Sequence, residues 1–343
     1  MSDRPLRFAI FGTGFWSRYQ LAAWQELAGV ECVALYNRTR SKAQALADEF
    51  GVASVYDDAA ALLAAEQLDF VDIISDVHTH ALFTRQAADA GLDVVCQKPM
   101  ASSLDEARGM VEHCGRAGVR LFVHENWRWQ TPLRALKPVL DSGVIGAPFR
   151  GRIQYANDFP VFDNQPALRE LEQFVLTDIG SHILDVARFL FGDATRLYCE
   201  TQQVHEGIRG EDVATVMMTM GGGMSVVCEM SYSSQLEHGR FPETYVVVEG
   251  DNGSAELGPD YRLSVTAGGR TESWRAPPPT YAWAEPAYSL VHSSIVACNA
   301  DLLAALREGR DAETAAADNI RTVELFYRAY ESAAAGQVIS LRD

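Results

Sequence analysis

Basic residues are scarce in this sequence. Its 343 residues include 29 lysines and arginines against 46 aspartates and glutamates, which gives a formal net charge of -17. A field of that sign repels the phosphates of nucleic acids and of anionic membranes, so neither is an expected partner. A phosphate group can still bind locally, because the amino end of a helix presents unpaired N–H groups.

Paired cysteines and long apolar runs are missing as well. The six cysteines form no C-x-x-C motif and several lie in apolar segments, which favours buried thiols over disulfides or a zinc site. No apolar run approaches the ~20 residues of a membrane span. The first strand begins near residue 6, which leaves no room for a signal peptide. We therefore expect a cytoplasmic protein without a membrane partner.

What is present is a large apolar fraction, 48% of a chain long enough for two domains. Residues 6–124 alternate Ile/Val-rich segments with helical patterns, which predicts an α/β domain over 1–124 with a doubly wound parallel sheet. The predicted strands are 6–11, 31–36, 69–74, 93–96 and 120–123. The predicted helices are 15–28, 40–50, 58–65, 79–91 and 103–117.

The pattern changes after residue 124 and predicts an α+β domain over 125–343 with a large, mostly antiparallel sheet. A helix is predicted at 178–191, lying on this sheet, with further helices near 131–141, 286–308 and 314–335. The predicted strands are 148–158, 195–205, 212–220, 223–234 and 243–250. The segment 223–234 has one strongly apolar face, expected to pack on the 178–191 helix. That face consists of Met224, Val226, Cys228, Met230 and Tyr232.

A glycine-rich loop stands where the first strand passes into the first helix. It runs Gly12, Thr13, Gly14, Phe15, Trp16. Gly12 permits a tight turn, and Gly14 lets the backbone approach a pyrophosphate at the helix amino terminus. Ser17 replaces the third glycine of the usual fingerprint, so the helix is expected to pack slightly farther from the sheet. An ordinary turn is the alternative, but the surrounding β-α-β pattern favours dinucleotide binding.

The end of the second predicted strand bears on the choice of dinucleotide. Asn37 stands where an acidic residue would hold the ribose hydroxyls of NAD, and Arg38 and Arg40 follow it. These arginines can meet a 2′-phosphate, which favours NADP weakly and leaves dual use of NAD and NADP open. The alternative is that both arginines are only solvated.

Two further motifs carry groups that alcohol oxidation requires. Lys98 follows the 93–96 strand at the sheet edge where ligands bind, and Pro99 restricts its backbone to an extended form. Its ammonium can stabilise a reacting oxygen in its alkoxide-like form. Asp178 and His182 are four residues apart, which places both on one face of a helix. The imidazole can accept a hydroxyl proton near neutral pH, and Asp178 can orient the ring or bind a second hydroxyl.

Each of these residues also has a plain alternative: Lys98 as a surface lysine, His182 as a satisfied core histidine. Asp185, three residues after His182, is either a supporting group or solvated.

With these motifs in order, the chain resembles the Gfo/Idh/MocA oxidoreductases from end to end. The resemblance also rests on the segment Asn126–Pro132 (NWRWQTP) and on the G-x-H-x-x-D pattern inside the predicted helix. It implies an NAD(P) cofactor, sugar or polyol substrates, and homodimers or homotetramers joined through the large sheet. It makes Lys98, Asp178 and His182 the catalytic trio, with His182 the acid/base. The family's usual E-K-P is Q-K-P here, because Gln97 replaces the glutamate.

Other residues are expected to complete the site. Those expected at the cofactor are Asp76, His78, His80, Gln97, Trp127 and Arg128. Those expected at the substrate are Asn126, Arg128, Asp163 and Asn164. The alternatives are interface packing for Trp127 and Trp129, and a plain surface loop around residues 159–164. His78 and His80 form an H-x-H pair, but no third ligand is evident and no metal is expected.

The resulting hypothesis is an NAD(P)-dependent sugar dehydrogenase. On the family resemblance, oxidation of an aldose at C1 to a lactone is favoured, with pentoses such as apiose as candidates. The alternatives within the class are an inositol or polyol ring-hydroxyl dehydrogenase and a keto-sugar reductase. A different class is a non-catalytic regulator that binds the dinucleotide as a signal. Such regulators tend to lack the lysine or the histidine, and both are present here.

Overall fold

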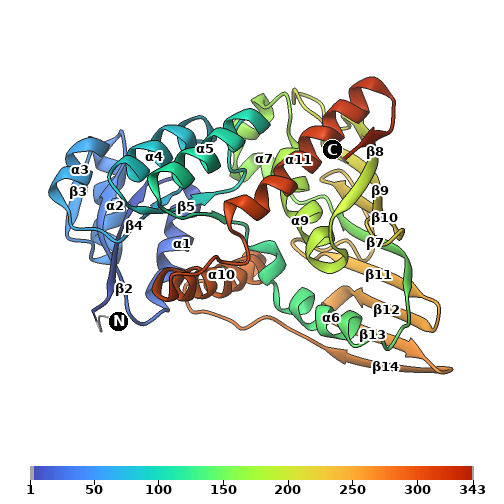
Figure 1. The fold of residues 1–343 in the computed structure, drawn as a ribbon. Helices are drawn as coiled ribbons and strands as arrows, with labels where there is room; N and C mark the ends of the chain where they lie inside the picture. Colours follow the sequence, from blue (N-terminus) through green and yellow to red (C-terminus); the bar gives the residue numbers. More distant parts are fainter. Residues whose placement is uncertain (1–3, 342–343) are drawn as a thin grey trace. The chain divides into compact units, whose positions relative to one another are not determined.

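The computed structural model describes residues 4–341, and its contacts divide the chain into two units (Figure 1). The first unit contains the chain up to Asn126, together with Tyr281–Ala284 and His292–Val323. The second contains Trp127–Thr280, Glu285–Val291 and the chain from Glu324 onward. The prediction assigned all residues after 124 to the second domain. In the structure, part of the C-terminal region belongs to the first unit.

The first unit is built on a six-stranded sheet in the order β3-β2-β1-β4-β5-β6, and every strand pair is parallel. The strands are β1 (Leu6–Phe11), β2 (Val30–Tyr36), β3 (Ser54–Tyr56), β4 (Phe70–Ile73), β5 (Asp93–Gln97) and β6 (Leu121–His124). This order confirms the doubly wound fold. The strand order reverses between β1 and β4, and ligands of such sheets bind at the carboxyl edge there.

In the part of this unit up to Asn126, one helix follows each strand from β1 to β5. These helices are α1 (Phe15–Gln25), α2 (Arg40–Phe50), α3 (Ala59–Ala65), α4 (Val77–Asp89) and α5 (Leu104–Ala117). Side chains cap three of them at the amino end, from Asp58, Asp76 and Ser103. The cap position of α1 is Gly14, and among the described side chains none caps this helix.

The second unit is built on a nine-stranded sheet in the order β14-β13-β12-β11-β7-β10-β9-β8-β15. All pairs are antiparallel except β7 with β10. The strands are β7 (Pro148–Ala156), β8 (Ala194–Gln202), β9 (Val213–Met220), β10 (Ser225–Ser231), β11 (Tyr245–Gly250), β12 (Gly253–Gly258), β13 (Arg262–Ala267), β14 (Arg270–Arg275) and β15 (Ile339–Ser340). The expected large, mostly antiparallel sheet is confirmed.

Helices pack on one face of this sheet. They include α6 (Thr131–Asp141), α8 (Val175–Asp178) and α9 (Gly180–Phe191), whereas the short helix α7 (Val161–Asn164) contacts the turn Pro166–Glu170. Within the sheet, α9 contacts β10 and β7. The apolar residues of 223–234 are buried as expected, since Val226 and Cys228 are fully inaccessible to solvent. The predicted 178–191 helix is two pieces, α8 and α9, joined at Ile179, whose backbone keeps right-handed helical dihedrals.

The opposite face of the sheet carries partly exposed apolar side chains. The strand register aligns one row across five strands: Tyr198, Met217, Val227, Arg152 and Val247. Met217 is 51% exposed and Val247 is 37% exposed. Arg152, within this row, forms an ion pair with Glu229 at 2.6 Å. We call this the outer face of the sheet.

Two long helices end the chain, α10 (Ser289–Glu308) and α11 (Ala316–Ala335). The segment Pro286–Glu308 is long and apolar enough to cross a membrane, which corrects the expectation that no stretch approaches that length. Within its most apolar window, however, 72% of the residues are buried inside the protein, as in a core helix.

Candidate active site

The loop between β1 and α1 has the geometry that a dinucleotide requires. Gly12 has a φ of +103°, and a Cβ there would lie 2.5 Å from the carbonyl oxygen of Ile74. The backbone of β1 therefore passes so close to that of β4 that only glycine fits. Gly14 differs, because a Cβ on it would meet nothing within 4 Å among the described residues.

The amino end of α1 is suited to an anion. Its first turn carries no acidic side chain among the described residues, and no side chain caps it. Its N–H groups and dipole are thus available to a pyrophosphate that approaches over Gly14. Ser17 is fully buried, and its hydroxyl donates to the Gly14 carbonyl at 2.6 Å, so the serine is accommodated within the first turn. Together with the open space at Gly14, this arrangement fits the predicted cofactor.

The residues after β2 are held near the surface. The Asn37 backbone N–H donates to the backbone carbonyl of Tyr56 at 3.2 Å, and the Asn37 side-chain amide donates to the Thr39 carbonyl at 3.1 Å. Arg38 is exposed, whereas a guanidinium nitrogen of Arg40 lies 3.9 Å from the Asp57 carboxylate. Arg38 is therefore better placed than Arg40 to meet a 2′-phosphate.

The three residues predicted to contact the cofactor after β4 differ in their exposure to solvent. Asp76 caps α4 by accepting from the His78 N–H at 3.0 Å, and both side chains are exposed. His80 is only 1% exposed. Within the described residues, no group of three His, Cys, Asp or Glu side chains is placed to hold a metal ion.

The His80 ring connects two loops of the first unit. Its Nε2 lies 3.1 Å from the Ser75 carbonyl, and its Nδ1 lies 3.2 Å from the Pro99 carbonyl and 3.3 Å from that of Met100. Burial lowers the pKa of this imidazole. The side chain thus braces the turn that contains Lys98, and a contact with the cofactor remains a prediction.

Lys98 directly follows β5 and is half-buried, and its peptide bond to Pro99 is cis. The Lys98 N–H donates to the side-chain carbonyl of Gln97 at 2.8 Å. The Gln97 amide in turn donates to the side-chain carbonyl of Gln20, on α1, at 2.9 Å. Gln97 therefore belongs to a buried hydrogen-bond chain that begins at the lysine backbone.

That chain ends on Asp72, a residue that the sequence analysis missed. Asp72 lies in β4 and is fully buried. The Gln20 amide nitrogen lies 2.8 Å from each Asp72 oxygen, and the Trp24 indole donates to one of them at 2.7 Å. Burial raises the pKa of Asp72 to about 7, although the indole and amide bonds favour the charged form. An aspartate inside a Phe-Val-x-Ile strand was the available signal, because a buried charge requires partners.

Asp178 and His182 lie in the second unit, at the junction of α8 and α9. The His182 N–H donates to the Ile179 carbonyl at 3.0 Å, and the side chain is only 4% exposed. Asp178 is half-buried, and its carboxylate accepts from the Tyr232 hydroxyl at 3.0 Å. Since helical backbone joins them, the two groups are one turn apart as predicted.

Trp127 holds the imidazole of His182. The two rings stack with centroids 4.3 Å apart and planes 21° from parallel. The Trp127 indole donates to the Thr244 hydroxyl at 3.0 Å, which fixes the tryptophan itself. Packing within the second unit is therefore the observed role of Trp127, and its predicted contact with the cofactor is untested.

Arg128 and Asp185 form a buried, two-bond ion pair at 2.7 and 2.6 Å. This pair ties the turn Trp127–Trp129 to α9, and it gives Asp185 a supporting role. Asn126 belongs to the first unit, where its amide donates to the Ser294 hydroxyl at 2.7 Å. Contacts of Asn126 and Arg128 with substrate stay predictions.

A second residue that the sequence analysis missed supports the catalytic helix. Glu211 is 8% exposed, and its carboxylate accepts from the N–H groups of Phe174 and Leu176 at 3.2 and 3.1 Å. The Tyr330 hydroxyl also donates to it, at 2.6 Å. Glu211 thus caps the amino end of α8, the element that carries Asp178.

The predicted loop residues Asp163 and Asn164 are exposed, and Asn164 donates weakly to Tyr288 at 3.4 Å.

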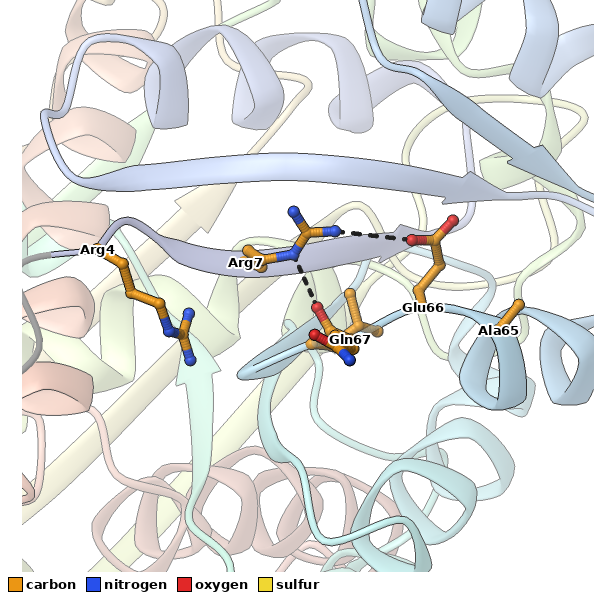
Figure 2. Close-up of a pocket in the computed structure, with 6 residues that line it drawn as sticks. Arg4, Arg7, Ala65, Glu66 and Gln67 are labelled. Carbon is orange, nitrogen blue, oxygen red and sulfur yellow. Dashed lines mark hydrogen bonds and ion pairs between the residues drawn. The ribbon is translucent and has the colours of Figure 1, made fainter.

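A shallow hollow of about 420 Å³ lies elsewhere, at the amino end of β1 (Figure 2). Arg4 donates to Asp69 at 2.7 Å, and a guanidinium nitrogen of Arg7 lies 3.8 Å from Glu66. These cations are paired. The hollow lies at the edge of the sheet opposite the carboxyl ends, so it is separate from the predicted cofactor site.

The fold and these motifs define an NAD-binding oxidoreductase. Residues 6–125 match the family model for an oxidoreductase family with an NAD-binding Rossmann fold. Residues 133–256 match the model of the GFO/IDH/MocA C-terminal domain. The chain belongs to the Gfo/Idh/MocA family.

Similar proteins include two D-apiose dehydrogenases. That of Paraburkholderia graminis is 43% identical over 334 residues, which cover 97% of this chain and 89% of the relative. That of Rhizobium rhizogenes is 38% identical over 341 residues, 99% of each chain. A crystal structure of an Agrobacterium radiobacter oxidoreductase, in complex with NAD+, L-tartaric acid and magnesium, has a TM-score of 0.96 and 39% identity. The match covers 98% of this chain and 98% of that one.

Proposed function

We propose that this protein is an NAD(P)-dependent dehydrogenase that oxidises the anomeric carbon of an aldose to a lactone. The observation that carries the proposal is the α8–α9 junction. There, an imidazole stacked against Trp127 stands one helical turn from a half-buried carboxylate. An acid/base pair of this kind serves removal of a hydroxyl proton. The family's established chemistry supports the same role for the site.

The catalytic residues act as follows in the proposal. His182 accepts the proton of the hydroxyl on the sugar carbon that is oxidised. Lys98 donates a hydrogen bond to the developing oxyanion and stabilises its charge. Asp178 orients the imidazole or binds a neighbouring hydroxyl. The nicotinamide, when bound, supplies the hydride acceptor. The bonds balance, because the sugar loses one C–H and one O–H bond and its C–O bond becomes C=O, while the proton forms an N–H bond on His182 and a bound nicotinamide would take up the hydride with its electron pair.

The cofactor is proposed to lie on the β1–α1 loop and along the carboxyl ends of the first sheet. The residues proposed to hold it are Gly12, Thr13, Gly14, Phe15, Trp16, Asn37, Arg38, Asp76, His78, His80, Gln97, Lys98, Trp127 and Arg128. The residues proposed to contact the sugar are Lys98, Asn126, Arg128, Asp163, Asn164, Asp178 and His182. The open space at Gly14 and the unblocked amino end of α1 support this placement of the pyrophosphate.

The substrate is proposed to be a pentose, with the branched aldose D-apiose as the first candidate. The support is similarity to two enzymes named for that sugar over 97% and 99% of this chain. The test is a dehydrogenase assay over aldoses, inositols and keto-sugars with NAD and NADP separately. Reduced nicotinamide and a hydroxylamine-trapped lactone are expected with a pentose.

Matched controls separate the alternatives. A methyl glycoside blocks C1 but leaves the ring hydroxyls intact, so it should not turn over. Turnover of the methyl glycoside or of an inositol would show oxidation of a ring hydroxyl. Dinucleotide binding without turnover of any sugar would indicate a regulator.

We also propose a cytoplasmic homodimer or homotetramer that associates through the outer face of the nine-stranded sheet. The half-exposed Met217 and Val247 on that face support it.

A further inference from the structure

The buried carboxylate of Asp72 is connected to the backbone of Lys98 through the side-chain amides of Gln20 and Gln97. Asp72 lies in β4, and Gln20 and Trp24 lie one turn apart on α1, the helix above it. The surroundings are otherwise aromatic, because the ring of Phe8 lies 5.3 Å from that of Trp24 and 4.8 Å from that of Phe70. In such an apolar site, a lone carboxylate is costly unless its lone pairs accept hydrogen bonds.

Above its pKa of about 7, Asp72 is ionised, and its charge then sets the direction of every hydrogen bond in the chain. An ionised carboxylate only accepts, so Gln20 must present its NH2 group to it, and its carbonyl oxygen then faces Gln97. Gln97 must therefore donate to Gln20 and turn its own carbonyl oxygen toward the Lys98 N–H, at 2.8 Å. One charge thus orders two amide groups that are otherwise free to flip.

We propose that Asp72 is a positioning residue for Lys98, acting through Gln20 and Gln97 to hold the backbone N–H from which the lysine side chain extends. The inference rests on the catalytic role proposed for Lys98. From the other side, the His80 ring contacts the carbonyls of Pro99 and Met100. The lysine turn is thereby held at both ends, which fixes where its side chain starts.

The hydrogen-bond polarity makes the inference testable with isosteric substitutions. In Asp72→Asn, the new amide nitrogen faces the Gln20 amide nitrogen, and flipping Gln20 and Gln97 together would turn the Gln97 amide against the Lys98 N–H. In Gln97→Glu, the new carboxylate faces the Gln20 carbonyl, and flipping Gln20 would turn that carbonyl against Asp72. Each single variant therefore leaves two hydrogen-bond donors, or two acceptors, facing each other.

The double variant Asp72→Asn/Gln97→Glu reverses the chain without breaking it. The carboxylate introduced at position 97 accepts from the Gln20 amide and from the Lys98 N–H. The Gln20 carbonyl then accepts from the amide introduced at position 72, whose own carbonyl accepts from the Trp24 indole. Gln20 must only shift toward the amide nitrogen at position 72, because its own amide nitrogen lies 2.8 Å from both Asp72 oxygens in the wild type.

Each single variant is expected to lower kcat about 10-fold or more, because small displacements of a catalytic group cost that much. The double variant is expected to recover much of the kcat that each single variant loses, since the two changes act on one hydrogen-bond chain and are not additive. Sugar KM should change less than kcat.

Asp93→Asn is the matched control, because Asp93 lies at the other end of β5 and pairs with Arg120. It should affect thermal stability but not kcat. The stability of wild type, the two single variants and the double variant is also measured by thermal unfolding, which requires no substrate. Loss of kcat in both single variants with recovery in the folded double variant supports the inference. A folded double variant no more active than the single variants, or single variants that alter only stability, overturns it.

Lys98→Met separates this inference from the proposed function. If Lys98→Met turns over like wild type, the proposed role of Lys98 is wrong. If Lys98→Met is inactive while the Asp72 and Gln97 variants behave like Asp93→Asn, only the positioning role of Asp72 is wrong.

Discussion

At the scale of single residues, His182 is the group on which proton transfer depends. Its ring is held against Trp127 and is almost inaccessible to solvent. We expect His182→Ala to lower kcat by ~10²–10⁴-fold, the usual cost of losing a general acid or base. Steady-state kinetics at neutral pH check this. His113→Ala, on α5 in the first unit, is the control and should leave kcat unchanged. Near-normal turnover of His182→Ala would exclude His182 as the acid/base.

Asn37 bears on the choice between NAD and NADP. A carboxylate at this position bonds the ribose diol of NAD and repels a 2′-phosphate. Asn37→Asp should therefore raise the ratio of kcat/KM for NAD to that for NADP. Arg38→Gln should shift the ratio in the same direction, because it removes the exposed cation. The idea fails if both variants keep the wild-type ratio.

Asp72 also predicts how stability depends on pH. Its pKa is raised from 3.8 to about 7 in the folded protein, mainly by burial. The folded state therefore holds the proton more tightly than the unfolded chain. The stabilisation is complete below about pH 4 and is lost as the pH rises through about 7. The rise in pKa corresponds to on the order of 4 kcal/mol of unfolding free energy.

The measurement is the difference in unfolding free energy between wild type and Asp72→Asn, followed from about pH 4 to about pH 8. The thiols of Cys32 and Cys96 face the same carboxyl, but burial raises the pKa of both, so neither titrates in this range. Wild type should lose stability relative to the variant between about pH 4 and about pH 7. A constant difference would show that Asp72 does not titrate there.

The sequence predicted the site residues whose chemistry lies within one short motif. The glycine loop, the Lys-Pro dipeptide and the Asp178–His182 spacing are of this kind. Asp72 and Glu211 were missed because their partners come from distant segments. Gln20 and Asp72 are 52 residues apart, and Glu211 lies 119 residues from Tyr330. Spacing in the sequence carries no sign of such contacts.

At the scale of elements, the β1–α1 loop contains two glycines with different requirements. Gly12 has a positive φ and no room for a Cβ, whereas Gly14 has extended backbone and open space. We expect Gly12→Val to reduce folding stability by about 1–3 kcal/mol or more, through backbone strain and the clash with Ile74. Gly14→Val should fold like wild type yet lose most of its dinucleotide affinity.

Thermal unfolding without cofactor and calorimetry with NAD and NADP measure the two effects separately. Wild-type cofactor affinity in a folded Gly14→Val protein would exclude this loop as the pyrophosphate site. Wild-type stability of Gly12→Val would show that the close approach to β4 is not required.

The elements that the sequence predicted best are buried and strongly patterned. β1 and α2 have the predicted limits, 6–11 and 40–50, because the spacing of their apolar residues and the turn residues beside them indicate the same ends. β3 was missed because it has only three half-buried residues. β12, β13 and β14 were missed because few of their residues are apolar and buried, and β14 is exposed along its whole length. The break at Ile179 was missed because helical spacing continues through it.

At the scale of the whole molecule, the outer face of the nine-stranded sheet is expected to join subunits. A two-fold axis brings identical patches together, so Met217 and Val247 would meet their own copies or each other. The neighbouring Glu229 and Glu249 are already paired with Arg152 and Arg150. An added carboxylate at the centre of such a face would be duplicated across the axis, buried and unpaired, which is strongly unfavourable.

We therefore expect Met217→Glu/Val247→Glu to shift the protein from an oligomer toward the 37.7 kDa monomer. Light scattering at micromolar concentration measures the mass. Leu82→Glu, at a side chain 46% exposed on α4, is the control and should leave the assembly intact. A wild-type mass equal to one chain would contradict the oligomer, and an unchanged mass in the double variant would place the interface elsewhere. Because the net charge is -17, the added carboxylates also increase repulsion between subunits, and raised salt should partly restore the assembly.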